Sequence, residues 1–212
     1  MRILFSLRIL GLLLMIFSST MIFPMLISLS ENGHTAFTFL NALALTFTSG
    51  LLLWLVSSGS KQELRIRDGF LITSLFWCVL GCFGSLPFYL SDALDLTLIE
   101  SIFESISGLT TTGATVITGL DELPKSILFY RQLLQWLGGI GIIVVAVAIL
   151  PMLGIGGMQL YKAETPGPSK DSKIAPRITE TAKALFLVYL SLTVVCALAY
   201  FLAGMTWFDA IC

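Results

Sequence analysis

The segment GLTTTGATVITG, residues 108–119, differs in character from the sequence on either side of it. Its neighbours are rich in leucine, isoleucine and phenylalanine, whereas this segment is uncharged and consists largely of threonine and glycine. Threonine is β-branched and favours extended backbone, and glycine adopts backbone conformations that other residues avoid. The segment therefore predicts a non-helical interruption in a chain that is otherwise hydrophobic and helical.

The chain as a whole is too apolar for an ordinary soluble domain. Of its 212 residues, 56% are hydrophobic and only 12% are charged, about half the usual charged fraction. Several charge-free stretches exceed the roughly 20 residues with which a helix crosses a bilayer. These stretches are 9–30, 35–60, 69–91, 132–161 and 184–208. We therefore expect an all-α integral membrane protein with five transmembrane helices, surrounded by a lipid bilayer. The net charge of −1 gives no reason to expect nucleic acid as a partner.

Lysine and arginine residues concentrate in particular connections between the predicted helices. They precede the first helix and fill the links between helices two and three and between helices four and five, so that only Lys125 and Arg131 lie elsewhere. Cationic loops stay in the cytoplasm, so we expect a multi-pass protein with a cytoplasmic N-terminus. The segment between helices three and four then begins and ends outside, and residues 98–120 are expected to enter the membrane and return to the same side.

The first part of this re-entrant segment reads as a half-length helix. LIESIFESISGL, residues 98–109, has apolar residues at helical spacing and would be about 18 Å long, roughly half a hydrocarbon core. Non-helical backbone at membrane depth is tolerated only where protein or a water-filled cavity satisfies it. We therefore predict a pore helix followed by a filter loop whose carbonyl groups replace the water shell of a monovalent cation. The alternative is a polar hairpin packed between helices.

Acidic residues outnumber basic ones on the predicted outer side, which favours cations over anions there. The acidic residues are Glu31, Asp92, Asp95, Glu100, Glu104, Asp121, Glu122 and Asp209, against Lys125 and Arg131. Glu100 and Glu104 share one helical face, so a carboxylate-pair enzyme is conceivable. No Ser/His/Asp arrangement can be assembled around the single histidine, His34, and we do not expect an enzyme.

Several motifs resemble the TrkH family, the membrane subunits of bacterial Trk potassium-uptake systems within the Trk/Ktr/HKT superfamily. The most specific is FESISGLTTTGATVITGLDELPKSILFYRQLLQWLGGIGIIVVAVAILPMLGIGGMQLYKAETPGP, residues 103–168, which is similar to the first pore repeat of that family. RDGFLI (67–72), GSLPFYL (84–90) and PRITETAKAL (176–185) also resemble it. The resemblance implies that Thr111 and Thr112 coordinate potassium through backbone carbonyls, with Gly113 and Ala114 continuing the filter at 110–115.

The resemblance also implies a domain organisation and partners. In this family four helix–loop–helix repeats surround one pore, and cytoplasmic TrkA, a nucleotide-binding regulatory subunit, controls a homodimer in the bacterial inner membrane. Potassium is the substrate, and no covalently bound cofactor is implied. The expected parts are a two-helix membrane domain outside the pore (1–60), the first repeat (61–161), a non-helical cytoplasmic loop (162–178) that offers a contact for TrkA, and the start of a second repeat (179–212).

Two alternatives remain open at this stage. The sequence ends before a second filter, so we expect an N-terminal fragment or truncated product, and either potassium uptake by assembly or a non-conducting fragment or scaffold is compatible with it. The glycine-rich GGIG at 138–141 either allows close helix packing or lets the helix bend as a pore opens.

Overall fold

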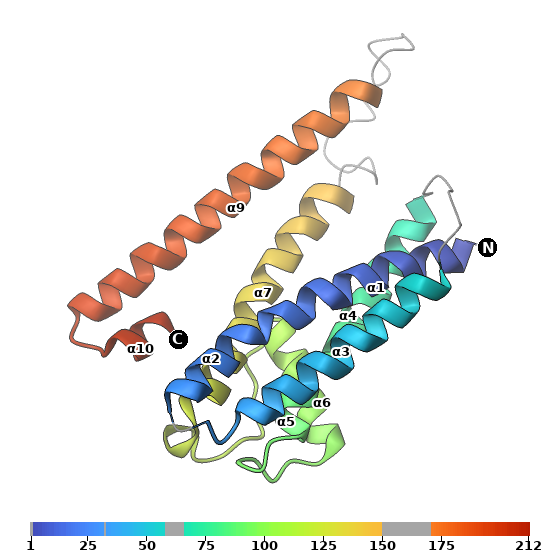
Figure 1. The fold of residues 1–212 in the computed structure, drawn as a ribbon. Helices are drawn as coiled ribbons and strands as arrows, with labels where there is room; N and C mark the ends of the chain where they lie inside the picture. Colours follow the sequence, from blue (N-terminus) through green and yellow to red (C-terminus); the bar gives the residue numbers. More distant parts are fainter. Residues whose placement is uncertain (1, 32, 58–65, 150–170) are drawn as a thin grey trace. The chain divides into compact units, whose positions relative to one another are not determined.

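The computed structural model describes residues 2–31, 33–57, 66–149 and 171–212, and the regular elements in these ranges are all helices (Figure 1). They are α1 (Arg2–Thr20), α2 (Ile22–Ser30), α3 (Ala36–Val56), α4 (Ile66–Gly84), α5 (Leu86–Tyr89), α6 (Leu98–Leu109), the 3₁₀ turn η1 (Leu120–Glu122), α7 (Lys125–Ile149), α9 (Asp171–Leu202) and α10 (Trp207–Ile211). The all-α fold expected from the sequence is confirmed. The chain divides into two units, Met1–Gly138 and Gly139–Cys212, and each is described by itself.

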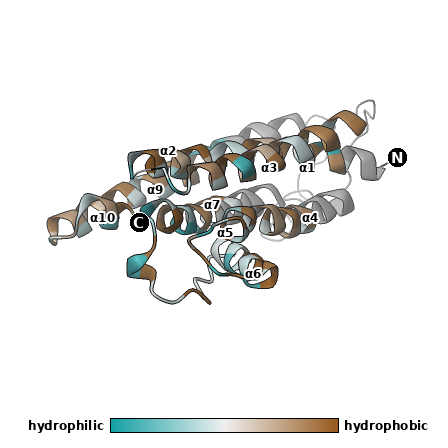
Figure 2. Cartoon of the chain, turned by 60° about the horizontal axis from the view of Figure 1, so that its bottom comes forward, coloured by the Kyte–Doolittle hydropathy of each residue, from teal (hydrophilic) through white to brown (hydrophobic). Residues whose placement is uncertain are grey.

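Three helical segments within the described residues are long and apolar enough to cross a membrane. They are Ser6–Ser30, Ala36–Val56 and Glu180–Leu202, and Figure 2 shows hydrophobic residues along them. Large apolar side chains such as Phe37 stay exposed on their surfaces, which suits lipid rather than water. The chain is therefore a membrane protein. The fourth expected span continues past Ile149 into residues outside those described, so the number of five spans stays a prediction.

The first expected span is one apolar segment but two helices, because α1 and α2 are separated at Met21. Pro24 lacks an amide hydrogen, and its ring conflicts with the carbonyl group four residues earlier, that of Thr20. Just before the break, the hydroxyl groups of Ser18 and Thr20 donate to carbonyl oxygens three residues back, each over 2.7 Å. The interruption therefore has a local cause in the sequence.

Helices α1 and α3 lie side by side with their backbones in contact at one crossing point (Figure 1). A Cβ atom added to Gly11 would lie 2.6 Å from the carbonyl oxygen of Gly50, and one added to Gly50 would lie 2.7 Å from that of Gly11. Small residues permit this close approach, which favours helix association in membranes. Further along the pair, the guanidinium carbon of Arg8 lies 5.4 Å from the ring centre of Trp54.

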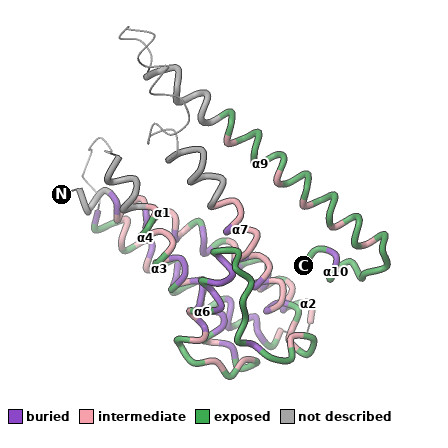
Figure 3. Tube along the Cα trace, turned by 180° about the vertical axis from the view of Figure 1, so that it is seen from behind, coloured by how far each residue is buried: buried purple, intermediate pink, exposed green. Residues whose placement is uncertain are grey.

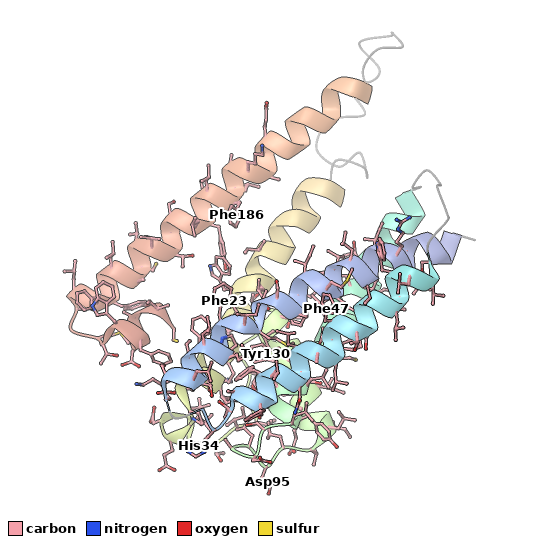
Figure 4. The ribbon with its side chains drawn as sticks, viewed as in Figure 1. Phe23, His34, Phe47, Asp95, Tyr130 and Phe186 are labelled. Carbon is pink, nitrogen blue, oxygen red and sulfur yellow. The ribbon has the colours of Figure 1, made fainter. Side chains whose placement is uncertain are left out.

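Tyr130 of α7 is the buried centre of the first unit, as Figure 4 shows. Its ring centre lies 5.6 Å from that of Phe39 on α3 and 5.2 Å from that of Phe88 on α5. Its hydroxyl group donates to the carbonyl oxygen of Gly84 over 2.9 Å, which removes the cost of burying that group. One residue thus ties α7 to three other helices.

The turn between α2 and α3 is bonded to the start of α7. The hydroxyl groups of Ser28, Thr35 and Ser126 form a buried chain with oxygen separations of 2.8 and 2.7 Å. Beside it, Glu31 accepts a hydrogen bond from the backbone amide of Lys125 and forms an ion pair with its side chain at 3.4 Å. The N-terminal helices therefore fix the point at which the chain re-enters the bundle.

In the second unit, α9 begins earlier than the sequence predicts. A non-helical loop was expected over 162–178, but residues 171–178 are already helical, and 162–170 lie outside the described residues. Pro176 is the sixth residue of this helix, and the helix continues through it. None of the residues in the most apolar part of Glu180–Leu202 is buried, and Figure 3 shows α9 as mostly exposed along its described length. The short helix α10 follows, with Trp207 stacked on Phe201 at 3.9 Å between ring centres.

The contact between α1 and α3 generates a stability prediction. We expect Gly50→Leu to lower the free energy of unfolding by about 1–3 kcal/mol, because backbone atoms of α1 occupy the space that the new side chain needs. The measurement is thermal unfolding of the purified protein in detergent. Ala44→Leu places the same side chain on an exposed position of α3 and should leave the melting temperature unchanged. Equal melting temperatures for the two variants would contradict the packing.

Candidate functional site: a short helix and its irregular loop

The short helix α6 occupies the residues that the sequence predicts for a half-length helix, Leu98–Leu109. Its start is fixed by a capping box: the amide of Glu100 donates to the hydroxyl oxygen of Thr97 over 3.3 Å, and the Glu100 carboxylate accepts from the Thr97 amide over 2.8 Å. Glu100 thus has a local structural partner. We therefore expect the first turn of α6 to stay helical regardless of the conformation of the loop that follows its C-terminal end.

The polar face of α6 is buried and its apolar face is exposed. Ser101, Glu104, Ser105, Ser107 and Gly108 are buried, whereas Ile99, Phe103 and Ile106 are among the exposed large hydrophobic residues. The apolar residues whose spacing predicts the helix therefore lie on its exposed surface. The buried side holds the groups that bond to the loop that follows.

The end of α6 rests directly on the backbone surface of α7. A Cβ atom on Gly138 would collide with the carbonyl oxygen of Leu109, and one on Gly108 would lie 3.0 Å from the Cβ atom of Leu134. The close packing expected at Gly138 of the GGIG motif is therefore confirmed, and its alternative role in helix bending stays a prediction. The neighbouring Gly139 instead faces the ring of Tyr189 on α9, within the second unit. The sequence also predicts a kink at Pro151 and close packing at the glycines of GIGG, 154–157, but these residues lie outside the described ranges.

The loop at residues 110–117, called loop 110–117 below, turns its first amide groups back onto α6. The amides of residues 110, 111, 112 and 113 donate to carbonyl oxygens of Ile106, Gly108 and Ser107 over 2.8–3.4 Å. These acceptors belong to the last turn of the helix, whose carbonyl groups have no helical partners. The helix end and the loop therefore satisfy each other.

The backbone of this loop is not the extended strand that three successive threonines predict. Thr110 has φ −81° and ψ 3°, Thr111 has φ 57°, and Gly113 has φ 73°. A positive φ at a β-branched residue is rare and strained. The difference is explained by the carbonyl groups at the end of α6, which lack hydrogen-bond donors within the helix. The left-handed conformation of Thr111 and Gly113 lets the amides of Thr112 and Gly113 both donate to one acceptor, the carbonyl oxygen of Ser107.

The carbonyl groups of Thr111 and Thr112 point away from α6. In a planar trans peptide the carbonyl group of one residue is directed opposite to the amide of the next. The amides of Thr112 and Gly113 face Ser107, so the two preceding carbonyl groups face the exposed side. Ala114 differs, because its carbonyl oxygen accepts the hydroxyl group of Ser107 over 2.6 Å. Thr111, Thr112, Gly113 and Ala114 are thus brought together in one exposed turn.

Glu104 holds the later part of the loop from inside the protein. One carboxylate oxygen accepts from the Thr115 hydroxyl group, from the Val116 amide over 2.7 Å and from the Ile117 amide over 3.3 Å. The other oxygen accepts from Nε of Arg131 over 3.3 Å. Glu104 is 3% exposed and Arg131 8% exposed, so both charges are buried together.

This pairing corrects two sequence expectations about charge. Glu104 and Arg131 do not belong to an acidic surface around a mouth, and Lys125 is paired with Glu31. Glu100 and Glu104 have different partners, so no carboxylate pair forms on α6. Of the acidic residues expected on the outer side, those of the first unit that the structure shows exposed are Asp92, Asp95, Asp121 and Glu122. Figure 4 shows Asp95 and His34 at the same end of this unit.

Sequence reasoning missed Ser107 as well as the pairing of Glu104. A usable signal existed, because Ser101, Glu104, Ser105 and Gly108 recur at helical spacing on the face opposite the isoleucines. A carboxylate among small residues on one helical face indicates a buried hydrogen-bond acceptor whose donors come from another segment of the protein.

A short helix followed by an irregular loop that displays carbonyl groups, in a bundle of apolar helices, is the arrangement of a pore-loop membrane protein. The TrkH family, described as cation transport protein, matches residues 35–211. The chain belongs to the TrkH family.

Individual relatives agree with this assignment. The Trk system potassium uptake protein TrkH of Halomonas elongata is 62% identical over 205 residues, which is 97% of this chain and 42% of the relative. TrkH of Escherichia coli K12 is 57% identical over 204 residues, or 96% of this chain and 42% of the relative. The crystal structure of the potassium transporter TrkH from Vibrio parahaemolyticus matches with a TM-score of 0.85 and 53% identity, covering 100% of this chain and 42% of that one. The chain thus spans less than half the length of these relatives.

The contact of Gly138 with the end of α6 generates a second prediction. We expect Gly138→Ala to lower the free energy of unfolding by about 1–3 kcal/mol, because the new methyl group meets the Leu109 backbone, which cannot rotate aside. Thermal unfolding in detergent measures the change. The adjacent Gly139→Ala meets only the side chain of Tyr189 and should cost less. A larger loss for Gly139→Ala would contradict this account.

Proposed function

We propose that this chain supplies one wall of a potassium-selective pore in the bacterial inner membrane. Potassium is the substrate, and the backbone carbonyls of Thr111 and Thr112 are its ligands within a filter at 110–115. The observation that carries the proposal is the orientation of the loop: its amides face α6, and these two carbonyl groups face the exposed side.

Carbonyl groups held in this way suit a dehydrated monovalent cation. Their dipoles replace the hydration shell, and an ion without strong directional preference accepts several such oxygens. Gly113 continues the turn with a left-handed backbone that few other residues adopt without strain. Ala114 continues the wall, and because a carbonyl oxygen has two lone pairs, its bond to Ser107 still leaves one lone pair.

The orientation proposed for the chain places its N-terminus in the cytoplasm. The lysine and arginine residues of the polar connections support this orientation. The exposed carboxylates Asp92, Asp95, Asp121 and Glu122 then face the outside, where they raise the local concentration of cations. The N-terminal domain (1–60) stays outside the pore, residues 61–161 form the first repeat, and 179–212 begin the second.

One wall does not enclose an ion, so the chain acts within a larger assembly. The resemblance to the TrkH family supports four such walls in a pore, a homodimer and control by the cytoplasmic subunit TrkA. The loop at 162–178 is the proposed contact for TrkA, and most of it lies outside the described residues. The alternative, a non-conducting scaffold, draws its support from the exposure of residues 110–116 in the isolated chain.

Expression in a potassium-uptake-deficient bacterium separates these two functions. The 212 residues alone are compared with a gene that carries this chain in a TrkH-length reading frame. Growth at low potassium with the 212 residues alone would show conduction by assembly. Growth only with the longer frame would make the isolated chain a scaffold or wall without transport of its own.

The role of the filter turn gives the central mutational prediction. We expect Gly113→Asp in the long reading frame to abolish rubidium uptake, because it adds a side chain and a charge next to the proposed potassium ligands, at a residue with positive φ. Gly33→Asp is the matched control: Gly33 has a similar φ of 75° and open space around it, but it lies in the turn between α2 and α3. Uptake that survives Gly113→Asp in membranes containing normal amounts of protein would contradict the assignment.

A further inference from the structure

The carboxylate of Glu104 gathers donors from the loop while it is itself buried against a second helix. We propose that Glu104, locked by Arg131, is a positioning residue that sets the discrimination between potassium and sodium through the second half of loop 110–117. This inference rests on the proposed function, since it concerns the same pore. The inference gives the Glu104–Arg131 ion pair a role in ion selectivity, whereas cation transport alone does not require this ion pair.

The first step is that the loop depends on this one acceptor. The Val116 amide and the Thr115 hydroxyl group both donate to the same oxygen of Glu104. The Ile117 amide forms a bifurcated hydrogen bond, to that oxygen at 3.3 Å and to the Thr115 hydroxyl oxygen at 3.1 Å. Water is scarce at membrane depth, so unsatisfied amides are costly. A carboxylate forms stronger hydrogen bonds than a neutral acceptor, and here it serves three donors.

The second step is that Arg131 fixes the carboxylate rather than the loop. Its Nε atom bonds to the oxygen that the loop leaves free, so each oxygen of Glu104 has its own set of partners. A buried charge without a partner is strongly destabilising, so the two side chains hold each other in place. Arg131 follows Tyr130 on α7, and both residues are anchored in the core of the first unit.

The third step connects this lock to the ions. Because the amides of Val116 and Ile117 face Glu104, the carbonyl groups of Thr115 and Val116 point the other way, to the exposed side. The position of the carboxylate therefore sets the position of these two carbonyl groups. Pore size and carbonyl field decide between potassium and the smaller sodium ion, so displacement of the loop changes the ratio of their uptake.

The experiment measures that ratio in the long reading frame, with rubidium uptake as the measure for potassium and sodium uptake beside it. Glu104→Gln keeps the shape but removes the charge. Loss of about one charge-assisted hydrogen bond should raise the sodium-to-rubidium ratio roughly tenfold. The double variant Glu104→Gln with Arg131→Gln avoids an unpaired arginine, so it should restore the amount of protein in the membrane while the ratio stays raised.

Two further variants make the readout specific. Glu100→Gln keeps the capping box, because glutamine also caps at this position, and its ratio should equal that of the unaltered protein. Thr115→Val preserves shape at an exposed position and removes one donor to Glu104 together with one of the two acceptors of the Ile117 amide. It should raise the ratio by a smaller factor, because the bond from the Val116 amide to Glu104 remains. It also keeps the proposal testable where the Glu104 variants fail to reach the membrane.

The outcomes separate positioning from a purely structural role. A structural role would lower rubidium and sodium uptake together, in proportion to the protein present, and would leave the ratio unchanged in the double variant and in Thr115→Val. That result would overturn the inference. Failure of the proposed function looks different: rubidium uptake would then be absent in the unaltered protein, or would survive Gly113→Asp.

Discussion

Backbone that leaves a helix loses its regular hydrogen-bond partners, and most amides of loop 110–117 find new ones on α6. The carbonyl groups in the last turn of α6 have no donors within the helix, and the first amides of the loop donate to three of them. Further along the loop, the amides of Val116 and Ile117 bond instead to the Glu104 carboxylate. Because the amides of 112, 113, 116 and 117 face α6 or its Glu104 side chain, the preceding carbonyl groups of Thr111, Thr112, Thr115 and Val116 face the other side. These carbonyl oxygens are turned toward the exposed side, an arrangement that suits a dehydrated cation.

The remainder of the first unit holds α6 and α7 in the positions that this loop requires. Gly138 allows the end of α6 to touch α7, and Arg131 projects from α7 onto Glu104. Tyr130 binds α7 to the helices around it, and the hydroxyl chain through Ser126 fixes where α7 begins. The N-terminal helices α1–α3 thus contribute support to the loop, although they supply none of its ligands.

Local signals made part of this structure predictable. The bounds of α6 follow from the capping residues at one end and the threonine–glycine run at the other. The re-entrant topology that the distribution of charge indicates stays a prediction. The partners of Glu104 were not predictable in the same way. Arg131 lies 27 residues away, and in the sequence a glutamate in a short helix looks like a surface charge. The left-handed Thr111 was missed for a related reason, because the needs of the preceding helix override the preference of threonine for extended backbone.

Membership of the TrkH family and the geometry of the loop lead to one central claim, that the Thr111 and Thr112 carbonyl groups hold the transported ion. Anomalous diffraction from crystals of a TrkH-length protein carrying this chain, grown in rubidium, tests it most directly. The account predicts a rubidium peak on the pore axis, in contact with both carbonyl oxygens, while the amides of Thr112 and Gly113 stay bonded to Ser107. Rubidium bound elsewhere in the pore, with these carbonyl groups turned into the protein, would contradict it.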